Sequence, residues 1–172
     1  EEVAQQTGLP DGCADIVTCA QSFHWMEPTA TLAEIARILR PGGLFAAYDY
    51  DAPPTVQWEL DRVAQEVTAR LVDLLRERGL AQTLKIWPKD KHLERMRESG
   101  HFRFTREVAL HSIERGDAAR YLAMMRSNAF SNQFQFGEQE TGFDRLTQTA
   151  FHCIGSEPIP WYFSYRVRLG VK

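Results

Sequence analysis

The sequence predicts an α/β fold built around neighbouring parallel strands joined by a crossover helix. Two apolar runs, residues 14–20 and 44–49, are expected to be strands, and a segment with the apolar period of a helix separates them. A strand, a helix and a second strand form a right-handed parallel βαβ unit. Both runs are continuous rather than alternating, which is typical of strands covered by helices on both faces.

The helix between the two strands is expected over residues 31–39. Thr31 and Glu34 have the spacing of a capping box. The apolar face of this helix is formed by Leu32, Ile35, Ala36 and Leu39. Pro41 disfavours helical geometry in the residue before it, and the two glycines that follow let the backbone turn without a steric penalty. We therefore expect a sharp corner before the second strand.

After residue 52 the pattern changes to helices. We expect helical segments over about 55–100 and 117–155, with Asp117 as an N-cap. A strongly amphipathic helix is indicated where apolar residues recur at helical spacing. These residues are Leu60, Val63, Ala64, Val67, Leu71, Leu74 and Leu75.

A pair of antiparallel strands is expected at 101–113 and 161–172. The second of these alternates between apolar and polar side chains, which is typical of a half-exposed strand. The polar side, which includes Arg166 and Arg168, is expected to face solvent. Together with about residues 1–52 as the sheet core, the chain is expected to form a single domain over 1–172.

Composition excludes several classes of partner. Hydrophobic residues make up 44% of the chain, charged residues 25%, and the net charge is -3, so nothing indicates a nucleic acid or an anionic membrane surface. No apolar run approaches the roughly 20 residues that span a bilayer. Cys13, Cys19 and Cys153 form neither a disulfide framework nor a metal-binding pattern. We therefore expect a reducing, cytoplasmic location and no metal.

Polar and aromatic residues follow both expected strands at their carboxyl ends, where open α/β sheets bind ligands. These residues are Gln21, His24, Trp25, Tyr48, Asp49 and Tyr50. Such a group can hold a polar small molecule against an aromatic wall. Alternatively, Phe23 and Trp25 plug the top of the core, and His24 is a solvated loop residue.

A longer stretch resembles a known family. The sequence TGLPDGCADIVTCAQSFHWMEPTATLAEIARILRPGGLFAAYD has an Ala-x-x-Thr-Gly-Leu-Pro approach that begins at Ala4, an acidic Asp15 that opens a strand, and Gln-x-x-His-Trp after that strand. It then has Glu-x-x-Arg-x-Leu-x-Pro-Gly-Gly before the next strand. Residues 3–50 are similar to class I S-adenosylmethionine-dependent methyltransferases, in the small-molecule group that includes trans-aconitate methyltransferase-like proteins.

The resemblance implies the C-terminal part of a Rossmann-like methyltransferase sheet, with parallel strands, a terminal antiparallel strand pair and helical lid insertions. It implies S-adenosylmethionine as the cofactor, with Ala4 and Gln5 near its adenine and Ala20 and Gln21 near its methionine end. Family members hold this cofactor mainly through a Gly-rich loop and a ribose-binding carboxylate, and this sequence has neither. We therefore expect an N-terminally incomplete domain that alone binds the cofactor weakly or not at all.

The resemblance further implies methyl transfer to a small-molecule acceptor. His24 is the candidate catalytic residue, either as a general base or as a hydrogen-bonding group for the acceptor. The candidate acceptor-binding residues are Trp25, Tyr48, Asp49, Tyr50, Trp58 and Arg126, the last in a segment, 120–134, that could close as a lid. The alternative is a non-catalytic, truncated methyltransferase-like module that acts through partner binding or forms a homodimer through an exposed sheet edge. A nicotinamide-binding enzyme is a weaker third alternative, because its glycine fingerprint is missing.

Overall fold

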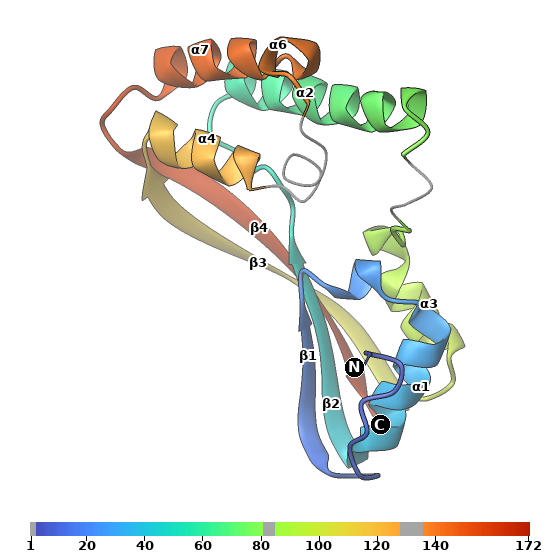
Figure 1. Cartoon of the computed structure of the whole chain (residues 1–172). Helices are drawn as coiled ribbons and strands as arrows, with labels where there is room; N and C mark the ends of the chain where they lie inside the picture. The colour runs from blue at the N-terminus through green and yellow to red at the C-terminus, as the bar shows by residue number, and fades with distance from the viewer. Residues whose placement is uncertain (1–2, 81–84, 128–135) are drawn as a thin grey trace. The chain divides into compact units, whose positions relative to one another are not determined.

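The computed structural model describes residues 3–80, 85–127 and 136–172, and these fall into two compact units (Figure 1). Unit 1 comprises the described residues of Glu1–Tyr50, Lys85–Leu110 and Ser164–Lys172. Unit 2 comprises those of Asp51–Leu84 and His111–Phe163. Within the three described ranges, no helix is both long enough and apolar enough to cross a bilayer.

The described strands form a sheet in the order β1-β2-β4-β3. Their bounds are β1 Ala14–Ala20, β2 Leu39–Tyr50, β3 Phe104–Gly116 and β4 Ile159–Val171. Strands β1 and β2 are parallel, and helix α1 (Pro28–Ile38) lies between them in the chain, which confirms the predicted βαβ unit. Strand β4 runs antiparallel to β2.

Strands β3 and β4 form the predicted antiparallel pair. In unit 1 the backbone N–H of Arg103, just before β3, donates to the carbonyl of Val171 at the end of β4. In unit 2 the end of β3 lies beside the start of β4, because a Cβ on Gly116 would stand only 2.3 Å from the Trp161 ring. The fold is therefore α/β, with parallel strands joined to a terminal antiparallel pair.

The Pro-Gly-Gly segment is part of strand β2 rather than the predicted corner. Ala14 is paired with Leu39, but Ile16 is already paired with Leu44, so β2 carries extra residues in a bulge. Gly42 adopts φ 80°, a left-handed conformation that favours glycine. A Cβ on Gly43 would lie 2.9 Å from the carbonyl oxygen of Arg40. The two glycines therefore allow a bulge, and backbone bonds to Lys172 hold it in the sheet.

Helix α1 begins earlier than the expected capping box. Its N-cap is Glu27, whose carboxylate accepts from the backbone N–H groups of Thr29 and Ala30, and Pro28 occupies the first turn. Thr31 is buried, and its hydroxyl has no hydrogen-bond partner among the described residues. Glu34 instead accepts bonds from Thr7 and Arg37. The predicted cap was wrong because Glu27-Pro28 is itself an N-terminal signal.

The core of unit 1 lies between one face of the sheet and the helices α1 and α3 (His92–Glu98) (Figure 1). Phe45 of β2 stacks on Phe102 with ring centroids 5.9 Å apart and meets Phe23 edge-on at 5.5 Å. The other face of β1 is open within unit 1, where Ile16 is 61% exposed. The prediction that helices cover both faces of β1 was therefore wrong for the described part of unit 1.

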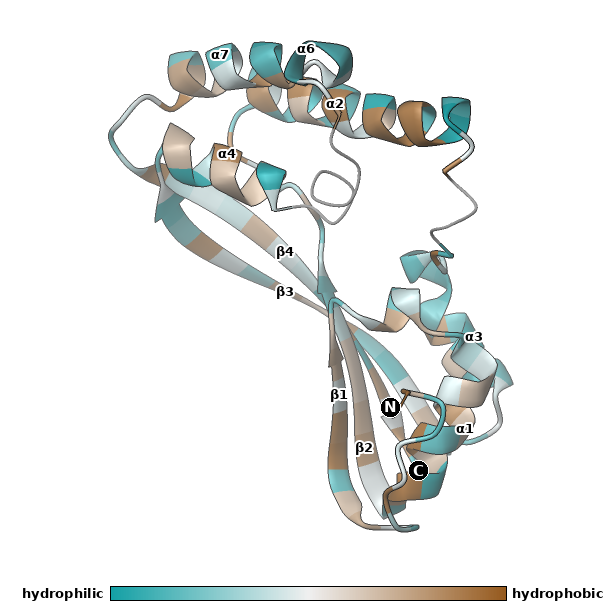
Figure 2. Ribbon diagram, in the orientation of Figure 1, coloured by the Kyte–Doolittle hydropathy of each residue, from teal (hydrophilic) through white to brown (hydrophobic). Residues whose placement is uncertain are grey.

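Unit 2 contains helices, the C-terminal end of β3 and the N-terminal end of β4. Its helices are α2 Trp58–Glu77, α4 Ala118–Arg126, α6 Glu138–Thr141 and α7 Phe143–Cys153. The seven apolar positions predicted to form one face of α2 are all buried, and Figure 2 shows hydrophobic and hydrophilic positions interspersed along this helix. Asp117 caps α4 as predicted. Gly142, with φ 76°, lies between α6 and α7 in the segment 117–155 that was expected to be helical.

Candidate functional site

The candidate site lies at the carboxyl ends of the parallel strands β1 and β2. Strand β1 ends at Ala20, and Gln21 then adopts φ 48°, a left-handed conformation that is uncommon for a residue with a side chain. The backbone N–H of Gln21 donates to the carbonyl of Tyr48 at 2.9 Å. The chain next forms a short 3-10 helix, η1 (Phe23–Trp25). This turn places the loop after β1 beside the end of β2, as the sequence predicted.

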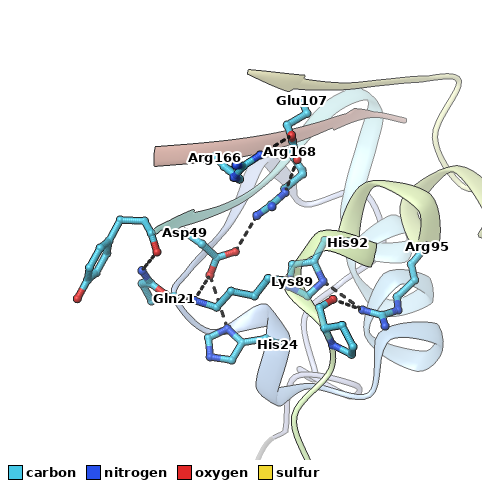
Figure 3. Close-up of polar contacts among 11 residues, drawn as sticks. Gln21, His24, Asp49, Lys89, His92, Arg95, Glu107, Arg166 and Arg168 are labelled. Atoms are coloured by element: carbon cyan, nitrogen blue, oxygen red, sulfur yellow. Dashed lines mark hydrogen bonds and ion pairs between the residues drawn. The ribbon is translucent and has the colours of Figure 1, made fainter. Parts of the chain in front are cut away.

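Asp49 is the centre of the site (Figure 3). Its side chain is 4% exposed, and its Oδ2 accepts a hydrogen bond from Nη1 of Arg168 at 3.0 Å. Its Oδ1 lies 3.4 Å from Nζ of Lys89 and 3.6 Å from Nδ1 of His24. One buried carboxylate of β2 is therefore surrounded by side chains from three other segments of unit 1: β4, η1 and the segment that holds Lys89.

The protonation state of Asp49 follows from these neighbours. Burial alone would raise the pKa of its carboxyl, because a charge is poorly solvated inside a protein. The side chain of His24 and the charge of Lys89 outweigh burial and bring this pKa below its ordinary value. Asp49 is therefore an anion at neutral pH.

Arg168 is almost fully buried, at 2% exposure of its side chain. Besides Asp49 it contacts Glu107 of β3, whose Oε2 accepts from Nε of Arg168 at 2.8 Å. Glu107 also lies 3.6 Å from Nη1 of Arg166. Arg168 was predicted to face solvent, and that prediction was wrong.

Strand register explains why Arg168 points inward. Ala47 of β2 is paired with Arg168 of β4, and Asp49 is paired with Arg166. Directly opposed residues in an antiparallel pair share a face, so both arginines project on the face that carries Asp49. The alternation of apolar and polar residues along β4 predicts apolar side chains at buried positions. At Arg168 the buried side chain is instead a cation paired with Asp49.

His24 is buried, with 7% of the residue exposed, so the interpretation as a solvated loop residue was wrong. Its ring packs beside Trp25 with centroids 5.0 Å apart, and its carbonyl accepts from the N–H of Trp87 at 2.8 Å. Trp25 is 39% exposed, so Phe23 rather than Trp25 fills the core.

His92, the first residue of α3, is a second buried histidine that the sequence did not reveal. Its ring lies on Phe23 with centroids 4.7 Å apart, and its Nε2 has no hydrogen-bond partner in the described ranges. Burial lowers the pKa of His92 to about 4, with a further contribution from the positive charge of Arg168. His92 is therefore neutral at physiological pH.

Lys89 contacts both the loop after β1, at Gln21, and the end of β2, at Asp49. It lies in the 3-10 helix η3 (Lys89–Lys91), and its ammonium donates to Oε1 of Gln21 at 2.7 Å. The amide nitrogen of Gln21 in turn donates to the carbonyl of Tyr50 at 3.3 Å. The Gln21 side chain is therefore held between β2 and the segment that precedes α3.

The structure brings together only some of the predicted residues. Gln21, His24 and Asp49 lie together, and Trp25 packs beside His24. Side chains alternate along a strand, so Tyr48 and Tyr50 project on the opposite face of β2 from Asp49. Tyr48 is exposed there, and the ring of Tyr50 lies 6.3 Å from that of Tyr165.

The other predicted site residues lie elsewhere in the chain. Ala4 and Gln5 are half-buried in a turn closed by a bridge between Val3 and Gln6. Arg126 and Trp58 belong to unit 2, where Arg126 pairs with Glu138 at 3.0 Å. Residues 128–134 of the expected lid lie outside the described residues. Throughout the described part of the chain, no cluster of three His, Cys, Asp or Glu side chains has the arrangement of a metal site.

Comparison with known proteins finds similarity to methyltransferases at the start of the chain. Residues 1–47 match the family model described as "Methyltransferase domain". An uncharacterized methyltransferase of Mycobacterium bovis is 45% identical over 40 residues, which are 23% of this chain and 16% of that protein. The chain therefore matches only about one sixth of the length of this curated relative.

Two solved structures share the fold across almost the whole chain. A putative type II methyltransferase from Anaeromyxobacter dehalogenans has a TM-score of 0.60 and 24% identity, covering 98% of this chain and 68% of that chain. A putative methyltransferase from Bacillus halodurans has a TM-score of 0.53 and 18% identity, covering 100% and 70%. The fold is that of a methyltransferase. The resemblance drawn from residues 3–50 is thereby confirmed at the level of the methyltransferase fold, whereas the small-molecule subgroup and the missing Gly-rich loop stay predictions.

Proposed function

We propose that this chain carries part of the active site of a cytoplasmic S-adenosylmethionine-dependent methyltransferase that acts on a small-molecule acceptor. One observation supports this most strongly. His24, Asp49 and Gln21 converge at the carboxyl edge of β1 and β2, within or directly after the segment that matches the methyltransferase domain. Ligands bind at that edge in open α/β sheets.

The residues at this edge suit one end of the cofactor. Ala20 is exposed and has no side chain beyond Cβ, so a ligand can approach the backbone closely. Gln21 is held in a left-handed conformation, and such strain is concentrated at functional sites. Lys89, beside Gln21, supplies a cation that suits the carboxylate of a methionine moiety. When bound, S-adenosylmethionine supplies an activated methyl group, so the protein has mainly to position the acceptor.

His24 and Trp25 are the residues that we place nearest the acceptor. The imidazole of His24 can take a proton from the acceptor or hydrogen-bond to it, because its ring has two nitrogens that can each donate or accept. Trp25 offers a half-exposed aromatic surface beside this imidazole. We further propose that Ala4 and Gln5 lie towards the adenine.

A non-catalytic module is the second candidate function, and the exposed strand β1 favours it. Asp15, Ile16, Thr18 and Ala20 are all exposed along this strand. An open strand of this kind can pair with a second copy of the chain or with another protein. This candidate predicts a homodimer or a complex without methyl transfer.

Methyl transfer from S-adenosylmethionine labelled in its methyl group distinguishes the two candidates. The assay uses the product of the complete gene, a panel of small acids, amines and phenols, and the variants His24→Gln and His101→Gln. His101 is an exposed histidine of the same unit and serves as the matched control. We expect label transfer to one acceptor class, lost on the order of 100-fold in His24→Gln and retained in His101→Gln. A protein that forms a dimer but transfers no label and binds no cofactor would support the module instead.

A further inference from the structure

Arg168 connects two carboxylates that belong to different strands. Its Nη1 donates to Oδ2 of Asp49 at 3.0 Å, and its Nε donates to Oε2 of Glu107 at 2.8 Å. This leaves Oδ1 of Asp49 turned towards the loop after β1, where Nδ1 of His24 lies 3.6 Å away (Figure 3). One side of the Asp49 carboxylate is therefore fixed by arginine, and the other faces a histidine.

We propose that Glu107, Arg168 and Asp49 form a positioning chain that keeps Nδ1 of His24 turned towards the carboxylate and leaves Nε2 for the methyl acceptor. The inference rests on the proposed function, because it assigns His24 a reacting partner. Arg168, Glu107 and Asp49 are positioning residues in this scheme, and only His24 touches the acceptor.

The geometry around His24 favours this orientation of the ring. The backbone of His24 is tied to Trp87, and the ring is flanked by Trp25, so the imidazole has little freedom to turn away from Asp49. Nδ1 of His24 and Oδ1 of Asp49 are both buried, and neither has a hydrogen-bond partner among the described residues. The separation of 3.6 Å is longer than a hydrogen bond. Catalytic contacts are often long without ligand and shorten when substrate binds.

Several other charged or titratable groups face the dyad of His24 and Asp49. Lys89 of η3 lies 3.4 Å from Asp49, but its side chain is 38% exposed and it also binds Gln21. His92 of α3 is neutral at physiological pH and contributes no charge. Arg166 of β4 approaches Glu107 at 3.6 Å. Arg168 is the one of these cations that is both buried and bonded to two carboxylates, so it is the group that fixes the direction of Asp49.

A buried ion pair can also have a purely structural role, and the test must separate the two. The structural role predicts that removing the charges of both Asp49 and Arg168 restores most of what removing one of them damages, because neither leaves the other as an unpaired buried charge. Glu107, which also loses Arg168, keeps its contact with Arg166 at 3.6 Å. The positioning role predicts that the double change restores folding but not the state of His24. The double variant Asp49→Asn with Arg168→Gln therefore distinguishes them.

The readout is the position of the proton on the neutral imidazole of His24, measured by nitrogen-15 NMR on the 172-residue chain at pH 8. We expect the proton on Nδ1 in the wild-type chain, because Asp49 can accept it. In Asp49→Asn, and in the double variant if its spectrum is that of a folded chain, we expect most molecules to carry the His24 proton on Nε2. In Arg168→Met we expect a mixture of molecules with the proton on Nδ1 and on Nε2. The exposed His101 is the internal control, and Asp90→Asn, which changes an exposed carboxylate next to Lys89, is expected to resemble wild type.

Two results would overturn the positioning chain: a wild-type proton on Nε2, or a proton that stays on Nδ1 in the double variant. Neither measurement needs an acceptor or a cofactor, so it remains informative if the methyl-transfer assay fails. If label transfer does occur, Arg168→Met is expected to lower kcat on the order of 100-fold with little change in KM, as a misplaced catalytic group would. Label transfer together with a wild-type proton on Nε2 would support the proposed function and rule out the positioning chain.

Discussion

Replacing Arg168 with methionine removes one positive charge from the interior of unit 1 while keeping much of the side-chain volume. Asp49, which is 4% exposed, would lose its hydrogen-bonded partner. Glu107 would lose its contact with Arg168 at 2.8 Å and keep the one with Arg166 at 3.6 Å. Breaking a buried pair by removing one partner costs about 3–5 kcal/mol, because the remaining charge is left uncompensated. Lys89 stays 3.4 Å from Asp49, so we expect the lower end of that range.

Thermal unfolding monitored by circular dichroism would measure this loss. For a chain of this length, 3 kcal/mol corresponds to a decrease in Tm of roughly 6–12 °C. Arg166→Met is the matched control: it makes the same change two residues away on the same strand, but Arg166 is 49% exposed. An exposed ion pair contributes about 0–1 kcal/mol, so the control should lower Tm by at most a few degrees. Equal losses in the two variants would refute the reasoning from burial.

Three further predictions concern folding. The pKa of His92, about 4, is below the ordinary value near 6.5, so the neutral form is favoured in the fold. The unfolded chain therefore takes up the proton first as pH falls, and stability should decrease from about pH 6.5 to pH 4 by up to roughly 3 kcal/mol. Urea titrations at a series of pH values should show that slope in wild type and a flatter one in His92→Phe; equal slopes would contradict the assignment. Gly43→Ala should cost about 1–3 kcal/mol, because its Cβ would press on backbone in the bulge of β2, and an unchanged urea midpoint would exclude that bulge. Glu27→Ala should cost about 1 kcal/mol by loss of the α1 cap. Thr31→Val should be neutral or stabilising, because it removes a buried hydroxyl that has no partner among the described residues. A lower urea midpoint for Thr31→Val than for Glu27→Ala would instead support Thr31 as the cap.

The parts of the fold that could be predicted from the sequence are those set by local patterns. The apolar runs of β1 and β2, the heptad-like face of α2 and the cap of α4 each depend on residues within a few turns of one another. The bulge in β2 could not be predicted in this way. Pro-Gly-Gly is compatible with both a turn and a bulge, and the choice depends on pairing with the distant residue Lys172.

The candidate site was predicted only on the side that comes from neighbouring loops. Gln21, His24 and Asp49 follow the strand ends, so topology alone placed them together. Arg168 is 119 residues from Asp49 and 61 from Glu107, and no periodicity connects positions so far apart. One signal was available: Asp49 continues a buried strand, and a buried carboxylate needs a cationic or hydrogen-bonding partner. That rule predicts that a partner exists without identifying which residue provides it.

The most direct test of the account is a crystal structure of the complete gene product with S-adenosylhomocysteine. Such a structure shows directly whether the carboxyl edge of β1 and β2 is the place of methyl transfer. We predict that the sulfur of the bound product lies beside Ala20 and Gln21, on the side from which the imidazole of His24 can reach the acceptor. A product molecule bound away from this edge would contradict the proposed site. So would a product molecule at this edge whose sulfur leaves no space for an acceptor beside His24.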